Sequence, residues 1–268
     1  MSRRIAVAAT APFGADVLER LSSRHEIASV LTRPDAPSGR GRKAAPSPAK
    51  VVAERLGIPV LDPERLTRGL ELDTDVVVAV AYGLIVPEPL LDERPWLNVH
   101  PSLLHRWRGA APVERALMAG DTESGVTIIR LVKELDAGPI AAQEVFAVEQ
   151  DDDAGDVYGR AADVATALLD RVLADPRPTF HDQVGEPSYA AKIATADRVL
   201  NLDRPAAELV NQVRALSPHI GARAELHGRG LTVWRARIGA DGSFEPVEVQ
   251  PDGGRRMAYD AWLRGLRP

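Results

Sequence analysis

The segment WLNVHPSLLHRWRGAAP, residues 96–112, places an asparagine and a histidine two positions apart at the end of an apolar run. Side chains alternate across a β-strand, so Asn98 and His100 share a face if this run is a strand. Asp136 follows a second apolar stretch, VTIIRLVKE. Because α/β sheets bind ligands where their strands end, these three residues could converge in one crevice. They are the candidate catalytic residues.

Each of the three residues also has a purely structural interpretation. An asparagine at a strand end often caps a turn, and an aspartate before Ala-Gly is common in turns. A lone histidine is more often a hydrogen-bonded structural residue than a catalytic one. The spacing alone therefore leaves both interpretations open.

The elements that would position these residues alternate between strand and helix. The run 75–81 is continuous and β-branched, which is typical of a strand covered on both faces. Such alternation predicts an α/β fold with a doubly wound, mostly parallel sheet. The predicted strands are 3–10, 25–33, 75–81, 95–100 and 126–132, and the predicted helices are 13–23, 47–57, 111–120 and 153–174.

The pattern changes after a linker rich in Pro and Asp. Residues 206–216 predict a helix, and 222–238 predict a hairpin around His227-Gly228-Arg229-Gly230. We therefore expect a catalytic domain over 1–183 and a smaller second domain over 184–268. Residues 189–268 carry 12 Lys/Arg and 9 Asp/Glu, a net charge of +3, whereas the first 188 carry 21 and 29, a net of −8. This asymmetry suits a polyanionic partner, although chance scatter explains it equally well.

Composition excludes several classes of site. The 268 residues include no cysteine, which excludes disulfides and thiolate chemistry and fits a cytoplasmic enzyme. G-x-G-x-x-G, G-x-x-x-x-G-K-[ST] and G-x-S-x-G are absent, and the six histidines form no H-x-x-x-H pair. We expect no metal, and we expect no membrane span because no apolar stretch is long enough.

The residues around the candidate site add a resemblance. The stretch 97–138 is similar to the formyltransferase family that uses 10-formyltetrahydrofolate, and within it to members that act on methionyl-tRNA. The resemblance implies a Rossmann-like catalytic domain followed by a smaller OB-like β-barrel. Further segments that resemble the same family are 32–50, 80–91, 189–193 and 206–236.

The resemblance also implies roles for the three candidate catalytic residues. Formyl transfer passes through a tetrahedral oxyanion, which needs hydrogen-bond donors and a group that moves a proton. Asn98 would donate to the formyl oxygen. A protonated His100 would also donate, and Asp136 would hold the imidazole charged or relay a proton through water.

Binding residues for the folate follow from the same resemblance. They are Ser102, Leu103, Leu104 and His105 directly after the histidine, with Tyr82, Gly83 and Leu84 contributing backbone groups to the pterin pocket. His105 departs from the family pattern, where a proline is usual.

The segment 35–50 is rich in Pro, Gly and Ser and carries Arg40, Arg42, Lys43 and Lys50. By itself it predicts a solvated, mobile loop. The resemblance implies that Arg40, Arg42 and Lys43 bind the phosphates of an initiator methionyl-tRNA.

The chain departs from the family at its C-terminal end. Only about thirty residues follow the hairpin, so we expect an abbreviated barrel. We expect a monomer. Two alternatives stay open: an N-formyltransferase for a small-molecule amine (a sugar nucleotide or purine precursor), and a catalytically idle folate- or RNA-binding module.

Overall fold

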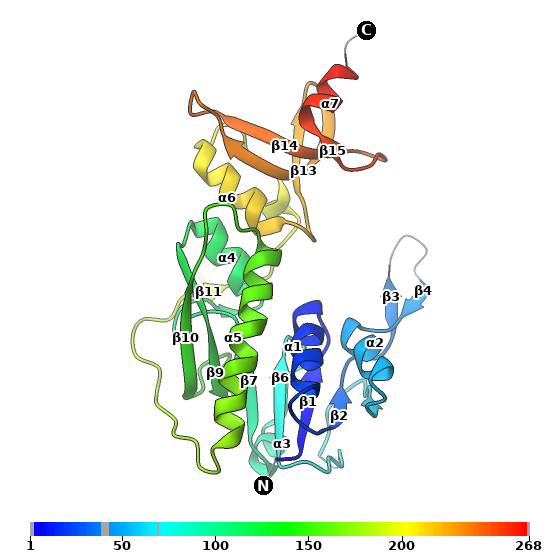
Figure 1. The fold of residues 1–268 in the computed structure, drawn as a ribbon, viewed down its shortest axis with the longest axis vertical. Coiled ribbons are helices and arrows are strands. Elements are labelled where there is room, and N and C mark those ends of the chain that lie inside the picture. The colour runs from blue at the N-terminus through cyan, green and yellow to red at the C-terminus, as the bar shows by residue number, and fades with distance from the viewer. Residues whose placement is uncertain (1–2, 39–42, 69, 267–268) are drawn as a thin grey trace. The chain divides into compact units, whose positions relative to one another are not determined.

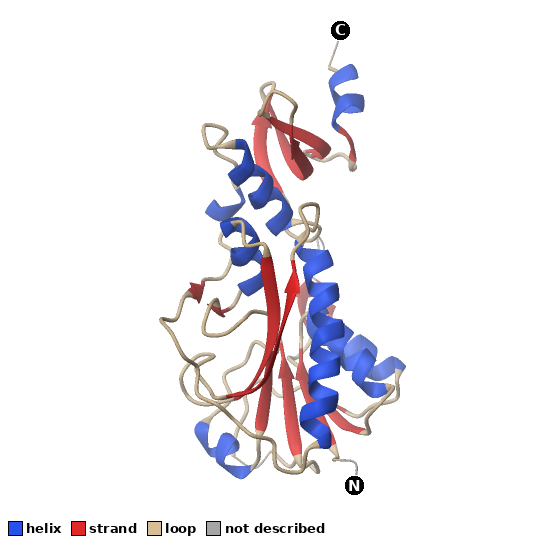
Figure 2. Ribbon diagram, turned by 60° about the vertical axis from the view of Figure 1, so that its left-hand side comes forward, coloured by secondary structure: helices blue, strands red, loops and turns tan. Residues whose placement is uncertain are grey.

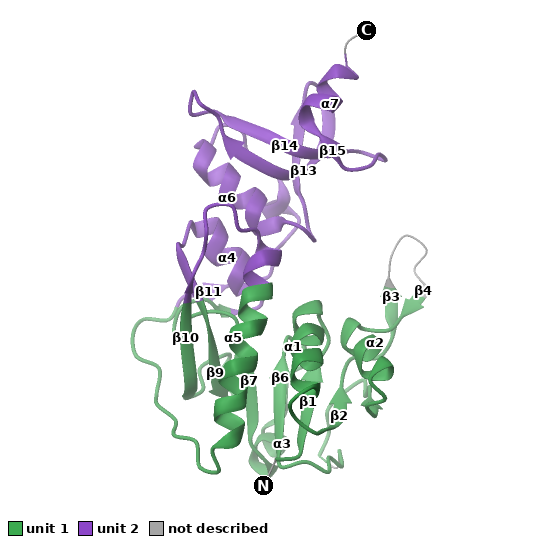
Figure 3. Ribbon diagram, viewed as in Figure 1, with its two compact units in different colours: residues 1–108, 125–145, 159–187 green, residues 109–124, 146–158, 188–268 purple. Residues whose placement is uncertain are grey.

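The computed structural model describes residues 3–38, 43–68 and 70–266. The described chain divides into two compact units (Figure 3), unit 1 with residues 1–108, 125–145 and 159–187, and unit 2 with residues 109–124, 146–158 and 188–268. A boundary between independent domains at residue 184 stays a prediction. In chain order (Figure 1) the elements are β1 (Ile5–Ala9), α1 (Pro12–Ser22), β2 (Ile27–Leu31), β3 (Ala36–Ser38), β4 (Lys43–Ala45), α2 (Pro48–Arg55), β5 (Val60–Leu61), β6 (Val76–Val80), α3 (Glu88–Glu93), β7 (Trp96–His100), β8 (Arg108–Gly109), α4 (Pro112–Ala119), β9 (Glu123–Arg130), β10 (Ile140–Ala147), α5 (Ala154–Ala174), β11 (Tyr189–Ala190), the 3-10 turn Ala196–Arg198, α6 (Ala206–Leu216), β12 (Ala222–Leu226), β13 (Arg229–Ile238), β14 (Phe244–Pro251), β15 (Met257–Ala258) and α7 (Tyr259–Arg264).

Unit 1 is built on a sheet of strand order β10-β9-β7-β6-β1-β2-β5. The pairs β1–β2, β1–β6, β2–β5 and β6–β7 are parallel, and β7–β9 is antiparallel. The central strands β1 and β6 are buried at every position, because layers cover both faces. The predicted α/β, mostly parallel sheet is confirmed.

Layers of different kinds cover the two faces of this sheet. Helices α1 and α5 lie against one face (Figure 2), and His25 after α1 contacts Asp170 of α5 at 2.8 Å. The opposite face is closed by α3 and connecting segments. That apolar cluster includes Ala6, Ala8, Leu31, Leu66, Leu72, Val77, Ala79, Tyr82, Leu90 and Trp96.

Unit 2 contains a four-stranded sheet of order β12-β13-β14-β15, with antiparallel neighbours throughout. The turn between β12 and β13 uses His227 and Gly228 at φ of 51° and 69°, the double left-handed conformation of a tight hairpin. Helix α6 and Trp262 of α7 pack on this sheet. The predicted small C-terminal β domain is confirmed. Its four described strands are one fewer than the five of an OB-fold.

The segment predicted to be a loop contains a short hairpin. Strands β3 and β4 pair in antiparallel register, with Ala36 opposite Ala45 and Pro37 opposite Ala44. Three-residue strands are too short to show an alternating hydrophobic pattern, so the sequence gives no strand signal there. Arg40 and Arg42 lie outside the described residues, and Lys43 begins β4.

Candidate functional site

Asn98 and His100 lie on β7, on the same face of the sheet. Trp96, Asn98 and His100 alternate with Leu97 and Val99, and Trp96 belongs to the apolar cluster on the α3 side. His100 is 4% exposed, although it is the last residue of its strand. The predicted strand therefore presents an amide and an imidazole to one side, as its spacing indicated.

Asp136 reaches these residues by a different route from the one predicted. Strand β9 ends at Arg130, and in its antiparallel pairing Arg130 lies opposite Leu97, at the far end of β7 from His100. The prediction that Asp136 sits at a strand end is therefore wrong. The connection 131–139 carries the carboxylate back over the face of β7, because an antiparallel neighbour ends at the opposite edge of the sheet.

The 131–139 connection brings the three predicted catalytic side chains together. Asn98 Nδ2 donates to Asp136 Oδ1 at 3.4 Å, and His100 Nδ1 lies 3.6 Å from Asp136 Oδ2. The imidazole and carboxylate side chains are 5% and 10% exposed. The imidazole and the carboxylate therefore face each other in a site from which most water is excluded.

A backbone carbonyl completes the surroundings of the imidazole. His100 Nε2 lies 2.8 Å from the carbonyl oxygen of Trp107. A carbonyl only accepts, so Nε2 carries the hydrogen, and Nδ1 is the nitrogen left to exchange a proton. Trp107 and Asp136 both have left-handed backbone conformations, with φ of 62° and 47°. Non-glycine residues adopt this region at a cost, which points to a site that the surrounding structure holds in place.

The loop that carries Asp136 is tightly constrained. A Cβ at Gly138 would stand 1.8 Å from the carbonyl oxygen of Arg130, so no larger residue fits the turn. Gln183 donates through Nε2 to the carbonyls of Asp136 and Gly138, at 2.7 and 2.9 Å. Sequence reasoning missed Trp107 and Gln183, because a carbonyl and a distant amide leave no spacing pattern.

The segment predicted to bind folate, Ser102 to His105, is held by two polar side chains of the sheet. Thr127 Oγ1 donates to Ser102 O at 2.7 Å and accepts from Leu104 N at 3.1 Å. Gln143 Nε2 donates to Leu104 O at 2.8 Å. The Ser102 and Leu104 side chains are buried, so hydrogen bonds and packing both hold the segment in place after His100. Its contact with a folate stays a prediction.

His105, the last residue of the predicted folate-binding segment, packs against Gly185. A Cβ at Gly185 would lie 2.2 Å from His105 Cε1. His105 therefore has a well-defined packing partner in place of the constraint that a proline ring would supply.

Tyr82, Gly83 and Leu84 follow β6 at the neighbouring strand end. The Tyr82 side chain is 4% exposed within the apolar cluster, and burial raises the pKa of its phenol to about 12. Its hydroxyl has no hydrogen-bond partner among the described residues. Gly83 has φ of 77° and open space beside it. The Tyr82 side chain is thus part of the core, which leaves backbone groups of 82–84 for a ligand.

Lys50 belongs to the structure rather than to a free basic surface. Its ammonium donates to Asp35 and to Asp62, each at 2.8 Å. The hydrogen bonds that Lys50 donates to the Asp35 and Asp62 carboxylates raise the pKa of Lys50. The Asp35 pair connects α2 to the start of the β3–β4 hairpin, and the Asp62 pair connects α2 to the end of β5.

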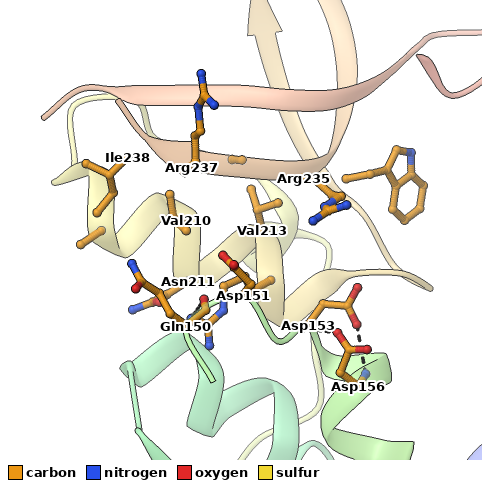
Figure 4. Close-up of a pocket in the computed structure, with 14 residues that line it drawn as sticks. Gln150, Asp151, Asp153, Asp156, Val210, Asn211, Val213, Arg235, Arg237 and Ile238 are labelled. Atoms are coloured by element: carbon orange, nitrogen blue, oxygen red, sulfur yellow. Dashed lines mark hydrogen bonds between the residues drawn. The ribbon is translucent and has the colours of Figure 1, made fainter. Parts of the chain in front are cut away.

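A cavity of about 680 Å³ lies within unit 2 (Figure 4). Residues 150–156, α6 and β13 line it, with Asp151, Asp153 and Asp156 among carboxylates and Arg235 and Arg237 among guanidinium groups. Arg237 is already paired with Glu245 at 2.8 Å. None of its described lining residues is a histidine, and both carboxylates and guanidinium groups line the cavity. The catalytic candidates therefore remain Asn98, His100 and Asp136.

Residues 3–38, 43–68 and 70–266 contain no group of three His, Cys, Asp or Glu side chains that could hold a metal ion. No helix described there combines the length and apolar character that crossing a membrane requires.

Two family models match the chain. The model described as formyl transferase matches residues 3–173, which include the whole set Asn98, His100 and Asp136. The model of the formyl transferase C-terminal domain matches residues 192–246.

Curated relatives match over nearly the full length. Methionyl-tRNA formyltransferase of Paracoccus denitrificans is 37% identical, over 98% of this chain and 97% of the relative. Methionyl-tRNA formyltransferase of Leifsonia xyli subsp. xyli is 42% identical, with the same coverage of both chains.

A similar fold occurs in solved structures. HypX from Aquifex aeolicus in complex with tetrahydrofolic acid superposes with a TM-score of 0.68 at 17% identity, covering 98% of this chain and 47% of HypX. At this identity, the likeness concerns the fold alone.

Proposed function

Since this chain belongs to the formyltransferase family, we propose that it transfers the formyl group of 10-formyltetrahydrofolate to the amine of initiator methionyl-tRNA. The observation that carries the proposal is the identity of 37–42% with methionyl-tRNA formyltransferases over nearly both full lengths. Neither the small-molecule acceptors nor the idle binding module has comparable support. The product, N-formylmethionyl-tRNA, serves translation initiation.

The reaction exchanges one carbon–nitrogen bond for another. The amine of the methionyl group attacks the formyl carbon, and the carbonyl electrons move to oxygen to give a tetrahedral oxyanion. When the oxyanion collapses, the bond between carbon and folate N10 breaks. The attacking nitrogen loses a proton and N10 gains one, so formamide and tetrahydrofolate leave with no change in oxidation state.

Asn98 is suited to stabilise the oxyanion. A side-chain amide has two N–H groups, and only one is directed at Asp136. The other remains available for the formyl oxygen. Donors fixed in a partly buried site stabilise a developing charge without reorganising.

His100 and Asp136 are suited to move the proton. With Nε2–H directed at the Trp107 carbonyl, the Nδ1 lone pair can take the proton that the attacking amine releases. The resulting imidazolium would face the Asp136 carboxylate across 3.6 Å. Return of that proton to N10 would assist its departure.

The donor set fits a folate cosubstrate without a metal. An amide, an imidazole and a carboxylate supply the hydrogen bonds and the proton carrier that transfer from N10 requires. Ser102, Leu103, Leu104 and His105, with the backbone of Tyr82, Gly83 and Leu84, are the proposed contacts of the folate. Its pterin would lie near the turn at Gly83, where the backbone is open.

The tRNA would be held by basic side chains. The proposed contacts are Arg40, Arg42 and Lys43 of the basic segment 35–50, supported by the net charge of +3 over residues 189–268. Guanidinium and ammonium groups bind phosphate oxygens by charge-assisted hydrogen bonds. We propose that the protein acts as a monomer in the cytoplasm. The absence of cysteine supports the cytoplasmic location.

The direct test of the function is an acceptor assay. Purified protein is incubated with 10-formyltetrahydrofolate and initiator methionyl-tRNA, and formylmethionine and tetrahydrofolate are quantified. Equal yields of both products are expected. Formylation of amino sugars or purine precursors, with methionyl-tRNA left unmodified, would overturn the proposal.

Replacing Arg40, Arg42 and Lys43 together with alanine is expected to raise the KM for tRNA and flatten its salt dependence. Each phosphate contact releases counterions and contributes a slope of about 0.7–0.9 in log K against log salt. Steady-state kinetics over a salt series measure both effects. The folate affinity should stay the same.

Arg65 and Arg68, exposed arginines in the connection 62–75, offer a control for the loss of positive charge. Their replacement by alanine should leave the KM for tRNA nearly unchanged. If the triple variant also keeps the wild-type KM and slope, the segment is only a solvated connection.

A further inference from the structure

The segment 180–184 lies along the loop that carries Asp136. Arg130 stacks over the Phe180 ring at 4.7 Å, and His181 and Ile140 exchange two backbone hydrogen bonds of 2.7 and 2.9 Å. Gln183, two residues after His181, donates to the carbonyls of Asp136 and Gly138. This segment therefore contacts both residues that flank the 131–139 connection and the part of it that carries Asp136.

The orientation of the Gln183 amide follows from its neighbours. Arg108 Nε and one terminal nitrogen both lie on Gln183 Oε1, at 3.1 and 2.6 Å. A guanidinium has only donors, so the group facing it must be the amide oxygen. The NH2 group then faces two carbonyls, which only accept. All four contacts are satisfied in one orientation alone.

The Arg108–Gln183 pair connects the two backbone segments that enclose His100. Arg108 directly follows Trp107, whose carbonyl receives Nε2–H, and Gln183 holds the backbone of Asp136, whose carboxylate faces Nδ1. Trp107 and Asp136, the two residues connected in this way, have left-handed backbone conformations, with φ of 62° and 47°. Such conformations persist where the surrounding structure determines them.

From these contacts we propose that Gln183 is a positioning residue for the His100–Asp136 pair, and that Arg108 orients its amide. The proposal rests on the proposed function, in which that pair moves the proton of formyl transfer. The hydrogen bonds of Gln183 join the Arg108 guanidinium to the backbone carbonyls of Asp136 and Gly138. Gln183 acts through the backbone, by setting the distance between Nδ1 and the carboxylate.

The test uses Gln183→Glu in the full chain. Glutamate keeps the acceptor for Arg108 but removes both donors to the Asp136 and Gly138 carbonyls. A misplacement near 1 Å can cost about 10²-fold, so kcat should fall about 10- to 100-fold, with both KM values within about twofold. Added to Asp136→Asn, the same change should cost less than about threefold further, because the carboxylate it positions is gone.

A second readout does not depend on turnover. Long-range ¹H–¹⁵N spectra of the histidine rings, with His100 assigned by its loss in His100→Ala, report its tautomer and titration. Gln183→Met, which removes the same donors and adds no charge, should change the titration of His100. A substitution that only destabilises the fold would lower the Tm and leave that titration unchanged.

The matched control is Gln250→Glu. Gln250 also accepts from one side chain, Trp234 Nε1 at 3.1 Å, and donates to one carbonyl, Gly254 O at 3.0 Å, within unit 2. Its replacement should leave kcat and the His100 titration as in the wild type. Gln183→Met, of similar length and uncharged, tests the same contacts if the carboxylate of Gln183→Glu prevents folding.

The outcomes separate the two proposals. A folded Gln183 variant with wild-type kcat and wild-type His100 titration would overturn the positioning role. A full further loss in the Asp136→Asn background would do so as well. If the wild type formylates no methionyl-tRNA but the His100 titration changes in the uncharged Gln183→Met, the proposed function fails while the positioning role stands.

Discussion

Replacing His100 with alanine is expected to lower kcat by about 10²- to 10⁴-fold, the usual contribution of a positioned proton carrier. Nδ1 is the one ring nitrogen open to exchange, since Nε2–H is directed at Trp107. Asp136→Asn should be severe too, because it keeps the shape beside Asn98 and removes the charge that stabilises the imidazolium. Rapid-quench formylation of initiator methionyl-tRNA measures each loss.

The double variant decides whether the two residues act together. If the imidazole and the carboxylate form one unit, His100→Ala combined with Asp136→Asn should be little worse than the worse single variant. Strict additivity would show that they act independently. His25 and Asp170 form a second imidazole–carboxylate pair, at 2.8 Å, between α1 and α5. His25→Ala is therefore the control and should retain wild-type turnover.

Replacing Asn98 with alanine is expected to lower kcat by about 10²- to 10³-fold, the usual cost of one oxyanion donor. The folate dissociation constant, measured by titration calorimetry, should change little, because the donor acts mainly on the charge that develops in the transition state. Single-turnover formylation separates this loss from changes in product release.

Asn98→Asp separates the loss of the hydrogen-bond donor from the loss of side-chain volume that Asn98→Ala also causes. It preserves the volume of the side chain but replaces the NH2 donor with a second acceptor next to Asp136. Turnover at least as low as that of Asn98→Ala is expected. Near-normal turnover in either variant would remove Asn98 from the catalytic set.

The fold was predictable where the residues carry a periodic signal. Helix α2 is one example: Ser47 accepts from Lys50 N at 3.0 Å, as its N-cap position and the following Pro48 indicated. The hairpin β12–β13 is another, because His227-Gly228 is a turn sequence between alternating strands. The β3–β4 hairpin was not predictable, since its three-residue strands are too short to carry such a signal.

The candidate site was predictable in its residue types but not in its geometry. Asn98 and His100 follow from alternation along one strand. Asp136 could be proposed, but its route could not, because nothing in VTIIRLVKE says that β9 runs antiparallel to β7. Contacts through a carbonyl, such as that of Trp107, depend on tertiary structure alone.

The position of residues 180–184 along the chain has a consequence for the order in which the protein assembles. The strands of the unit 1 sheet are all complete by Ala147, and α5 ends at Ala174, before Gln183 has been synthesised. A ribosome adds roughly 5–20 residues per second, so the sheet can pair within seconds before its last contacts exist. During that interval Asp136 lacks the two hydrogen bonds from Gln183. We therefore expect a nascent chain to acquire its fold first and its ordered His100–Asp136 pair later, once residue 183 has left the ribosome.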